Sequence, residues 1–586
     1  MGFLPAFFAV LVSTIFCFYS NQSFATHAAG ADLTYQCLGG LVYQVDATFY
    51  RDCGGTSEPG NITITYKSAA CGFTRTALAN KVLVNNGTEI TMPCATSPST
   101  CGGGISTGIR KWVYRTVITL PAACSDWVFS YRVCCRNCSI STIQNPCASG
   151  SEVYVEATLN NQAASCNSSP VFSNIPIAFV CLGQNFNFNQ GVYDPDGDSI
   201  SYELITPKTS AIAEVTFIPP ATQFAPVNSS TPFLLNSVTG DINFTPSSLQ
   251  ISILAVRVKE YRDGQLVGST IRDMQIYTQN CSNAIPAASG INGSSDFIAE
   301  VCADQQLCFT IHTSDVDTMQ QVSVLTSNPI QGAIINQTPG NRPDIQFCWT
   351  PTQNDISANP HVFTVTVYDN ACPFNGVQTF SYALYVQGPI NTISLINPTC
   401  YGGNNGSASV SVSGNAPFTY VWNTIPPQTN AFATGLSSGN YSVVVTDVSG
   451  CLATSNIAVI DPPVSITTNC TVSGINSCQA GNNASIQVNT TGGTGPYYYQ
   501  WNNGAITSSI SNLGSGVYTV TVTDAGGCST GATGIIPQAA GAVSATISTS
   551  SNVLCYGGNS GSIGLSVLVE HLPTVISGIM EHQLKI

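Results

Sequence analysis

A tandem repeat near the C-terminus constrains the fold of this 586-residue chain more than any other feature. Each copy opens with a cysteine, contains a Pro-aromatic segment ending in Trp-Asn, and closes with Val-Thr-Asp, two further residues and Gly-Cys. The first copy runs from Cys400 to Cys451 and the second from Cys478 to Cys528, and a third begins at Cys555. The opening cysteines lie 78 and 77 residues apart. This period predicts an array of small modules, which builds reach and multivalent surface more often than an active site.

Alternation of apolar with small or polar residues predicts that these modules are made of antiparallel strands. In the first copy it covers Ser407–Ser413, Phe418–Trp422, Tyr441–Thr446 and Leu452–Val459, and Gly-Asn and Ser-Gly steps provide turns. No helical periodicity longer than two turns occurs after the first 25 residues. We therefore expect an all-β fold of tandem immunoglobulin-like β-sandwich modules in a line, stapled by disulfides.

The N-terminus predicts secretion. Phe3–Tyr19 is almost wholly apolar, and Ser23, Phe24 and Ala25 give a small-x-small pattern for cleavage, so residues 1–25 are interpreted as a signal peptide. No later stretch reaches 18 apolar residues, so we expect no membrane span in the mature chain.

Charge and cysteine content narrow the class of partner. Only 8% of residues are charged, the formal net charge is −14, and no Lys or Arg occurs between Arg342 and Lys585. Nucleic acid is excluded as a partner on this basis, because its binding requires clustered cations. The 24 cysteines of a secreted chain indicate disulfides.

The cysteine content and the recurring motifs of the sequence change at several points, and these changes predict the domain boundaries. After the signal peptide we expect a Cys-rich β domain at 26–169, a β-sandwich at 170–283, a second one at 284–388, repeat 1 at 389–463, repeat 2 at 464–540 and a truncated repeat 3 at 541–586.

Two acidic loops are candidate metal sites. Asp194, Asp196 and Asp198 lie on one short loop with Gly197 at its bend, and Asp315 and Asp317 stand at the corresponding place in the next segment. Clustered carboxylates repel one another, and their oxygens suit Ca²⁺. We expect the first three carboxylates to converge on one calcium ion near a module boundary, although solvent exposure of the loop also explains them.

The repeats predict two disulfides. Cys400–Cys451 and Cys478–Cys528 bracket one module each at nearly equal spacing, so we expect both pairs to form. Cys555 would then lack a partner.

Other candidate residues have structural interpretations. Trp422 and Trp501 are predicted to be core residues rather than sugar-stacking platforms, and Asp447 and Asp524 to cap turns. The G-x-S-x-G matches around Ser106 and Ser437 lack the following helix of a nucleophile elbow. No triad, paired-carboxylate site or phosphate loop stands out, so no catalytic residue and no enzymatic activity are predicted.

The repeats resemble the SprB-type repeat of Bacteroidetes surface proteins. The resemblance is carried by the opening Cys-x-Gly-Gly-x-x-Gly-Ser, the Pro-Tyr-x-Tyr-x-Trp core and the closing Gly-x-Tyr-x-Val-x-Val-Thr-Asp-x-x-Gly-Cys. The second copy departs from it at Gln479-Ala480-Gly481. Residues 170–388 are similar to cadherin-like or PKD-like modules, mainly through the acidic loops. These resemblances imply export to the cell surface by dedicated machinery, and a role in adhesion or gliding.

The last residues differ from the array before them. Leu568–Ile586 contain two His, two Glu and one Lys, and no Tyr, Trp or Asn. A coding sequence for these last residues exists that, read one nucleotide out of phase, encodes a segment like Gly492–Ala505 of repeat 2. We therefore hypothesise a frameshift in repeat 3. We expect 544–567 to form at most a loose hairpin.

These observations predict a secreted or cell-surface, outer-membrane-associated adhesin or structural protein that is not catalytic. Its ligand would be an extracellular surface, a polysaccharide or a protein, with calcium stiffening some modules. The alternative is a carbohydrate-binding or scaffolding protein associated with polysaccharide degradation, which an exposed aromatic strip on one sheet would favour.

Overall fold

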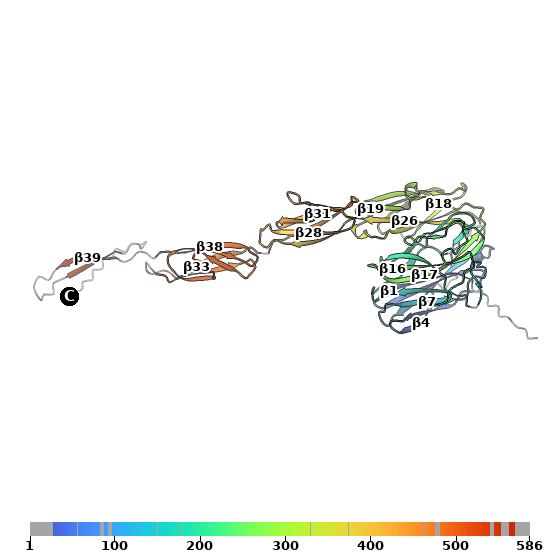
Figure 1. Ribbon diagram of the computed structural model, residues 1–586, viewed down its shortest axis with the longest axis horizontal. Helices are drawn as coiled ribbons and strands as arrows, with labels where there is room; N and C mark the ends of the chain where they lie inside the picture. The colour runs from blue at the N-terminus through green and yellow to red at the C-terminus, as the bar shows by residue number, and fades with distance from the viewer. Residues whose placement is uncertain are drawn as a thin grey trace, which may run out of the picture. The chain divides into compact units, whose positions relative to one another are not determined.

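The computed structural model describes residues 27–55, 57–82, 87–91, 97–148, 150–176, 178–327, 330–372, 374–462, 464–474, 481–538, 544–551 and 562–568. These residues form β-strands and three short 3₁₀ helices and contain no α-helix, so the expected all-β fold is confirmed (Figure 1). The chain divides into two compact units, 1–387 and 388–586, at a point next to the expected boundary between 388 and 389.

The first unit begins with a large twelve-stranded sheet. Its N-terminal strands are β1 (Ala28–Gly39), β2 (Val42–Asp52), β3 (Asn61–Ser68), β4 (Phe73–Lys81), β5 (Thr88–Glu89), β6 (Ile109–Thr119), β7 (Trp127–Val133) and β8 (Val153–Leu159), and a 3₁₀ helix spans Thr100–Gly102. Short alternating runs at Leu41–Tyr50, Asn61–Tyr66 and Lys111–Leu120 also predict strands, and these runs correspond to β2, β3 and β6.

The same sheet continues into the next segment of the chain. That segment contains β9 (Val171–Phe172), β10 (Ala178–Cys181), β11 (Phe186–Phe188), β12 (Val192–Tyr193), β13 (Ser199–Ile205), β14 (Leu234–Leu235), β15 (Ile242–Phe244), β16 (Gln250–Arg262) and β17 (Gln265–Gln279). Strand β17 pairs with β8 at Gly268–Thr270 and with β1 at Arg272–Met274. The expected boundary at 169/170 therefore divides one sheet, and the two N-terminal segments are not separate modules.

Buried ion pairs and a shared core hold this sheet together. The core cluster under β1, β2, β7 and β8 includes Trp127 and Phe129, and it extends to Ala255 of β16 and Ile271 of β17. Buried Arg272 reaches Asp32 of β1 with its Nη2 2.8 Å from Oδ2, and its guanidinium lies 3.8 Å from the ring centroid of Phe172.

The last segment of the first unit is a two-sheet sandwich. Its sheets have the strand orders β19-β26-β25-β22 and β20-β24-β23 around a core with Phe309, Phe347, Phe363 and Tyr382. The elements are β18 (Ala287–Ala288), β19 (Ile298–Cys302), β20 (Leu307–Ile311), β21 (Thr313–Ser314), β22 (Ser323–Ser327), β23 (Ile334–Gln337), β24 (Ile345–Trp349), β25 (His361–Tyr368), β26 (Val377–Gln387), and 3₁₀ helices at Ile291–Gly293 and Gln353–Asp355.

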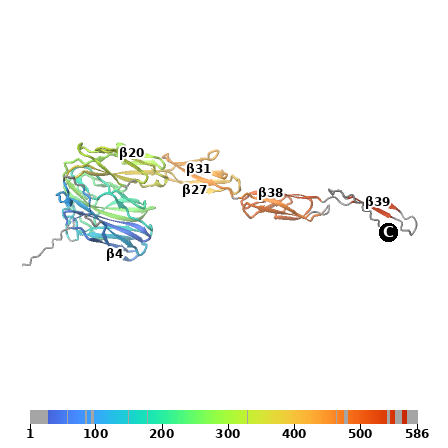
Figure 2. The same ribbon diagram turned by 180° about the vertical axis from the view of Figure 1, so that it is seen from behind.

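In the second unit, both complete repeats have the same two three-stranded sheets (Figure 2). Repeat 1 pairs β27-β28-β30 and β29-β31-β32, and repeat 2 pairs β33-β34-β36 and β35-β37-β38. The bounds are β27 (Ile390–Ile396), β28 (Gly406–Ser413), β29 (Thr419–Trp422), β30 (Phe432–Leu436), β31 (Gly439–Thr446), β32 (Leu452–Val459), β33 (Thr467–Ser473), β34 (Ala484–Thr491), β35 (Tyr498–Trp501), β36 (Ser509–Leu513), β37 (Gly516–Thr523) and β38 (Ser529–Ile536). The strands predicted for repeat 1 are confirmed.

The third repeat contributes one described hairpin. Strands β39 (Ser544–Ser551) and β40 (Ser562–Leu568) pair antiparallel with a register shift between Ile547 and Thr549. This is the hairpin expected for 544–567. The rest of the tail, 569–586, and Cys555 lie outside the described residues.

Candidate functional site

The loop between β12 and β13 folds around the carboxylate of Asp194. Its Oδ1 accepts hydrogen bonds from the backbone N–H of Asp196 at 2.9 Å and of Asp198 at 3.1 Å. Gly197 has a φ of 82°, a conformation that favours glycine, so the chain turns back at this residue. The loop is thus organised by its own first aspartate, as an Asx turn is.

A third carboxylate reaches this loop from the sheet. Glu260 on β16 is 0% exposed. Asp194, Asp198 and Glu260 each offer one carboxylate oxygen, and these three oxygens lie within 4.8 Å of one another. Asp196 is not in this group, contrary to the expected convergence of the three loop aspartates. Its Oδ2 accepts the backbone N–H of Ser168 instead.

This group of three carboxylates is contacted by one positively charged side chain and by two neutral hydrogen-bond donors. Arg262 donates from Nε to Asp198 Oδ1 at 2.7 Å and from Nη2 to Oδ2 at 2.8 Å. Glu260 Oε1 accepts from Asn167 Nδ2 at 2.7 Å and from the Tyr35 hydroxyl at 2.9 Å. Asp198 is therefore neutralised, while Asp194 Oδ2 and Glu260 Oε2 are buried and have no hydrogen-bond partner among the described residues.

Burial and mutual repulsion change the acidity of the two remaining carboxyls. Burial, with the nearby Asp194 charge second, raises the pKa of Glu260 to about 9. Burial also raises the pKa of Asp194 to about 6. At neutral pH and without a cation the pair consequently retains a proton on Glu260, and a divalent cation would compete with that proton.

The second acidic loop, between β21 and β22, is organised in the same way. Asp315 Oδ1 accepts the N–H of Asp317 at 2.8 Å, and Asp317 Oδ2 accepts the N–H of Ala284 at 2.9 Å. Asn283 donates from Nδ2 to Asp369 Oδ2 at 2.6 Å. Asp315 Oδ2 is buried without a hydrogen-bond partner in the described part of the chain. Burial, with a smaller contribution from the nearby Asp315 charge, raises the pKa of Asp369.

The two loops therefore share one hydrogen-bond pattern. In both loops, the first aspartate forms an Asx turn. The second aspartate accepts a backbone N–H from the segment that leads into the loop's part of the chain. An asparagine of that same segment donates a hydrogen bond to an acidic residue that lies in, or just after, a later strand. The equivalent pairs are Asn167 and Asn283, Ser168 and Ala284, Asp194 and Asp315, Asp196 and Asp317, and Glu260 and Asp369. We call them the first and second acidic sites.

Sequence reasoning found the loop aspartates but missed the asparagines and the later acids. A signal was present: Asn167 and Asn283 both begin an Asn-x-x-Pro sequence. Glu260 and Asp369 both follow a Val-x-Val-x pattern, in Val256–Glu260 and Val365–Asp369.

The disulfide prediction for the repeats is wrong. Cys400 bonds Cys528 with a Cα–Cα distance of 5.5 Å, which joins the opening loop of repeat 1 to the closing turn of repeat 2. Cys451 is disulfide-bonded, but not to Cys400, and Cys478 lies outside the described residues.

The register of repeat 1 explains the error. Cys400 lies near the start of β28, where Ile396 of β27 pairs with Ser407. The turn that ends at Cys451 contacts Asn415, which lies just past the other end of β28. An eight-residue strand spans about 25 Å, and a disulfide needs Cα atoms within roughly 7 Å. Other bonds of the described chain are Cys37–Cys166, Cys53–Cys101, Cys71–Cys124, Cys134–Cys135, Cys138–Cys147, Cys181–Cys281 and Cys308–Cys348, and Cys302 and Cys372 are disulfide-bonded as well.

The repeat tryptophans and aspartates have the predicted structural roles. Trp422 is 0% and Trp501 2% exposed, and each indole Nε1 donates to a backbone carbonyl at 2.9 Å. Asp447 Oδ1 accepts the N–H of Cys451, and Asp524 Oδ1 accepts the N–H of Cys528. No α-helix follows Ser106 or Ser437 in the described chain, so neither has the setting of a nucleophile elbow.

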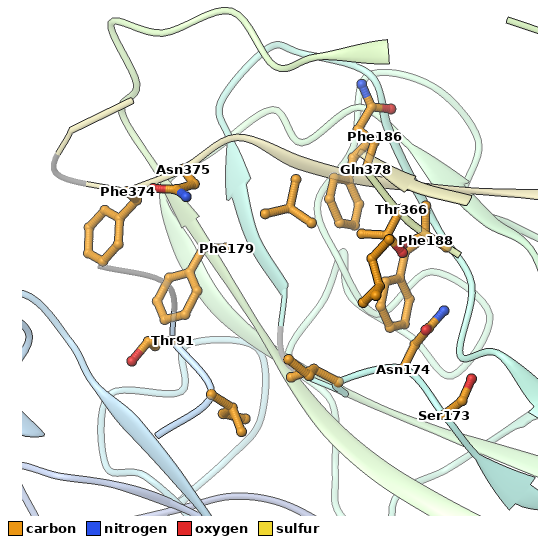
Figure 3. Close-up of a pocket in the computed structure, with 15 residues that line it drawn as sticks. Thr91, Ser173, Asn174, Phe179, Phe186, Phe188, Thr366, Phe374, Asn375 and Gln378 are labelled. Carbon is orange, nitrogen blue, oxygen red and sulfur yellow. The ribbon is translucent and has the colours of Figure 1, made fainter. Parts of the chain in front are cut away.

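An apolar pocket of about 120 Å³ lies between the sheet strands β10 and β11 and the following sandwich (Figure 3). Phe179 and Phe374 stack there with ring centroids 5.2 Å apart, beside Phe186 and Phe188 of β11. Its polar border is already bonded, since Gln378 Oε1 accepts from Asn187 Nδ2 at 3.1 Å. We interpret this pocket as a packing gap.

Comparison with known proteins identifies the repeats. Residues 392–426 and 476–506 match the family model of the SprB repeat, so the resemblance is confirmed and the chain contains SprB repeats. No curated protein matches the chain.

Solved structures with similar chains contain several cadherin or immunoglobulin domains each. Protocadherin gamma B7 cadherin domains 1–4 are 12% identical, with 58% of this chain and 92% of that chain covered and a TM-score of 0.18. The eight N-terminal Ig domains of Down syndrome cell adhesion molecule are 9% identical, covering 87% and 84%, at 0.18. Sidekick-1 immunoglobulin domains 1–5 are 10% identical, covering 86% and 98%, at 0.18. These low scores do not establish a common arrangement of domains.

The SprB repeats and the disulfides together define the chain as an extracellular, adhesin-like multidomain protein. Within the described residues, no helix is both long and apolar enough to cross a membrane.

Proposed function

We propose that the chain is a non-catalytic adhesin or structural protein of the bacterial cell surface, exported by dedicated machinery and used in attachment or gliding, and that calcium stiffens its two acidic sites. The observation that carries the calcium assignment is the repeated hydrogen-bond pattern. It places a buried carboxylate oxygen without a partner at the entrance of two successive segments of the first unit.

The residues of the first acidic site fit a hard cation. Asp194 Oδ2 and Glu260 Oε2 are carboxylate oxygens, the ligand type that Ca²⁺ prefers, and each lacks a hydrogen-bond partner in the described chain. At neutral pH a bound cation would replace the proton that the Asp194–Glu260 pair holds and would neutralise both carboxylates. Binding to the folded state alone then stabilises it by mass action.

Calcium titration of the full chain tests this proposal. We expect saturating CaCl₂ to raise the melting temperature of EDTA-treated protein, and Glu260→Gln and Asp315→Asn each to remove part of that rise. Glu300→Gln, on an exposed position of β19, is the control and should keep the full rise. An unchanged melting temperature of the wild-type chain would contradict the calcium assignment.

Attachment is tested separately, by displaying the chain on a non-adherent cell and measuring retention under flow. Retention above that of cells without the chain supports the adhesin. The carbohydrate-binding alternative is disfavoured by the burial of Trp422 and Trp501, which removes the most plausible stacking platforms of the repeats. Selective binding to one glycan of an array, without retention on uncoated surfaces, would favour that alternative.

A further inference from the structure

The Cys400–Cys528 bond joins two modules rather than closing one. Cys400 lies in the loop after β27, the first strand of repeat 1, and Cys528 directly precedes β38, the last strand of repeat 2. The sequence separation of 128 residues includes ten strands, β28 to β37. Both repeats are thus enclosed in one covalent loop, with only β27 and β38 outside it.

Both halves of this contact are built by local hydrogen bonds. In repeat 1, Asn405 Oδ1 accepts the N–H of Thr399 at 3.1 Å, and Gly403 donates its N–H to Cys400 O at 2.9 Å. In repeat 2, Asp524 Oδ1 accepts the N–H of Cys528 at 2.8 Å. The opening loop and the closing turn therefore hold the two cysteines in place independently of the bond itself.

The two loops also approach each other closely around the bond. A Cβ on Gly526 would lie 3.1 Å from Thr399 O, so the closing turn has little room for a side chain at this position. The Cys528 Sγ lies 3.3 Å from the same carbonyl oxygen. These contacts fit a defined interface between the end of one repeat and the start of the next.

We propose that this bond, here called the inter-repeat disulfide, is a mechanical bypass. Tension applied to the two ends of the chain passes from β27 through the bond to β38. Residues 401–527 lie outside that path and cannot be extended, whatever happens to their hydrogen bonds. Force can strip β27 from β28 and β38 from β37, but it cannot lengthen the rest of the two repeats while the bond is intact.

The closing turns suggest how the same device extends along an array. Asp447 bonds the N–H of Cys451 as Asp524 bonds that of Cys528, so the turn that presents the closing cysteine is repeated. In an array built with this pairing, the closing cysteine of each later repeat would bond the opening loop of the repeat before it, while Cys451 of repeat 1 has another partner. Such an array would bear load through disulfides, not through sheet hydrogen bonds.

Peptide mapping of the non-reduced full chain tests the connectivity. Trypsin cannot separate these cysteines, since no Lys or Arg lies between Arg342 and Lys585, so pepsin at low pH is used, which also prevents disulfide exchange. We expect a linked peptide containing Cys400 and Cys528. A Cys400–Cys451 peptide in its place would overturn the proposal.

Single-molecule stretching of the full chain by its ends tests the bypass. The C400S/C528S double variant should release up to about 46 nm more contour length than the wild type, at ~3.6 Å per residue, less any part of the loop that the Cys451 bond keeps closed. Stretching the wild type in a phosphine reductant also opens the other disulfides of the chain, so it should give a gain of at least the same size, which covers the case of a variant that folds poorly. Equal contour lengths for all three would overturn the proposal.

A matched control comes from a disulfide within one module. Cys308 and Cys348 face each other on the paired strands β20 and β24 and are 40 residues apart in sequence. The C308S/C348S double variant should add at most about 14 nm by the same length per residue, since Cys302 and Cys372, which flank this bond in sequence, are also disulfide-bonded. The two gains differ enough to assign each to its own bond.

Discussion

The guanidinium of Arg136 makes two parallel hydrogen bonds to the carboxylate of Asp273, with Nη1–Oδ1 at 2.9 Å and Nη2–Oδ2 at 2.7 Å. The Arg136 side chain is 0% exposed and that of Asp273 2%. The pair links the segment after β7 to β17, across the boundary at 169/170 that the sequence predicted. Its geometry is the bidentate form in which such pairs are strongest.

Removing one partner of this pair should be severely destabilising. We expect Arg136→Met to cost about 3–5 kcal/mol locally, because it leaves the Asp273 charge buried and unpaired. Hydrogen–deuterium exchange of β17 peptides in the full chain measures this loss. Arg132→Met is the control, since Arg132 is 68% exposed in its pair with Glu152 and should cost less than about 1 kcal/mol. The double variant Arg136→Met/Asp273→Leu should recover much of the loss, and no recovery would mean that packing, not charge, is responsible.

The first acidic site predicts an unusual pH dependence in calcium-free protein. Glu260 has a pKa of about 9 in the folded chain against 4.5 ordinarily, so the folded state holds a proton that the unfolded state releases. Stability should therefore fall as pH rises from about 4.5 to about 9, by several kcal/mol, since each unit of pKa difference is worth ~1.4 kcal/mol. Melting temperatures in EDTA across this range measure the effect.

Glu260→Gln should flatten this pH profile, because the amide does not titrate. Saturating calcium should flatten it in the wild type, because the cation replaces the proton. A wild-type profile that rises toward pH 9 in EDTA would show that Glu260 is ionised in the folded protein.

The repeat tryptophans should matter for stability and not for ligand binding. We expect Trp501→Ala to cost about 3–5 kcal/mol through the cavity it leaves. Trp501→Phe should cost less, because the ring volume is partly kept while the hydrogen bond to Thr507 O is lost. Tyr498→Ala on the same strand is the control, since its side chain is 63% exposed and its loss should change stability by less than about 0.5 kcal/mol. Exchange rates of peptides from β34 to β37 report these differences, and equal effects of Trp501→Ala and Tyr498→Ala would contradict the core assignment.

Local patterns were sufficient to predict the strands and the acidic loops. Alternation identified β28, β29, β31 and β32, because one face of each strand packs against the other sheet of its repeat. The Asx turn at Asp194 depends on its own neighbours alone, so its sequence predicted it.

Long-range pairing was beyond these patterns. Asp32 and Arg272 meet although 240 residues separate them, and nothing in either strand specifies the other. The pairing of Cys400 was wrong for a related reason: the direction of each strand decides at which end of the module a loop emerges. The equal spacing of the cysteines in the two repeats does not show at which end of its module each cysteine lies. Glu260 was missed because its role depends on the position of β16 beside the Asp194 loop.

The closing turn of repeat 2 should be sensitive to acid. The Asp524 carboxylate accepts the N–H groups of Thr494 and Cys528, which hold its pKa below the ordinary 3.8. A lowered pKa adds stability that is present above about pH 4 and is lost as pH falls through the folded value. We expect Asp524→Asn to lower the melting transition of the repeats at pH 6, with a difference from the wild type that shrinks toward pH 2. Calorimetry of the full chain measures this, with Asp296→Asn, at an exposed position, as the control. A difference that stays constant from pH 6 to pH 2 would mean that shape, and not the charge of Asp524, supports the turn that presents Cys528.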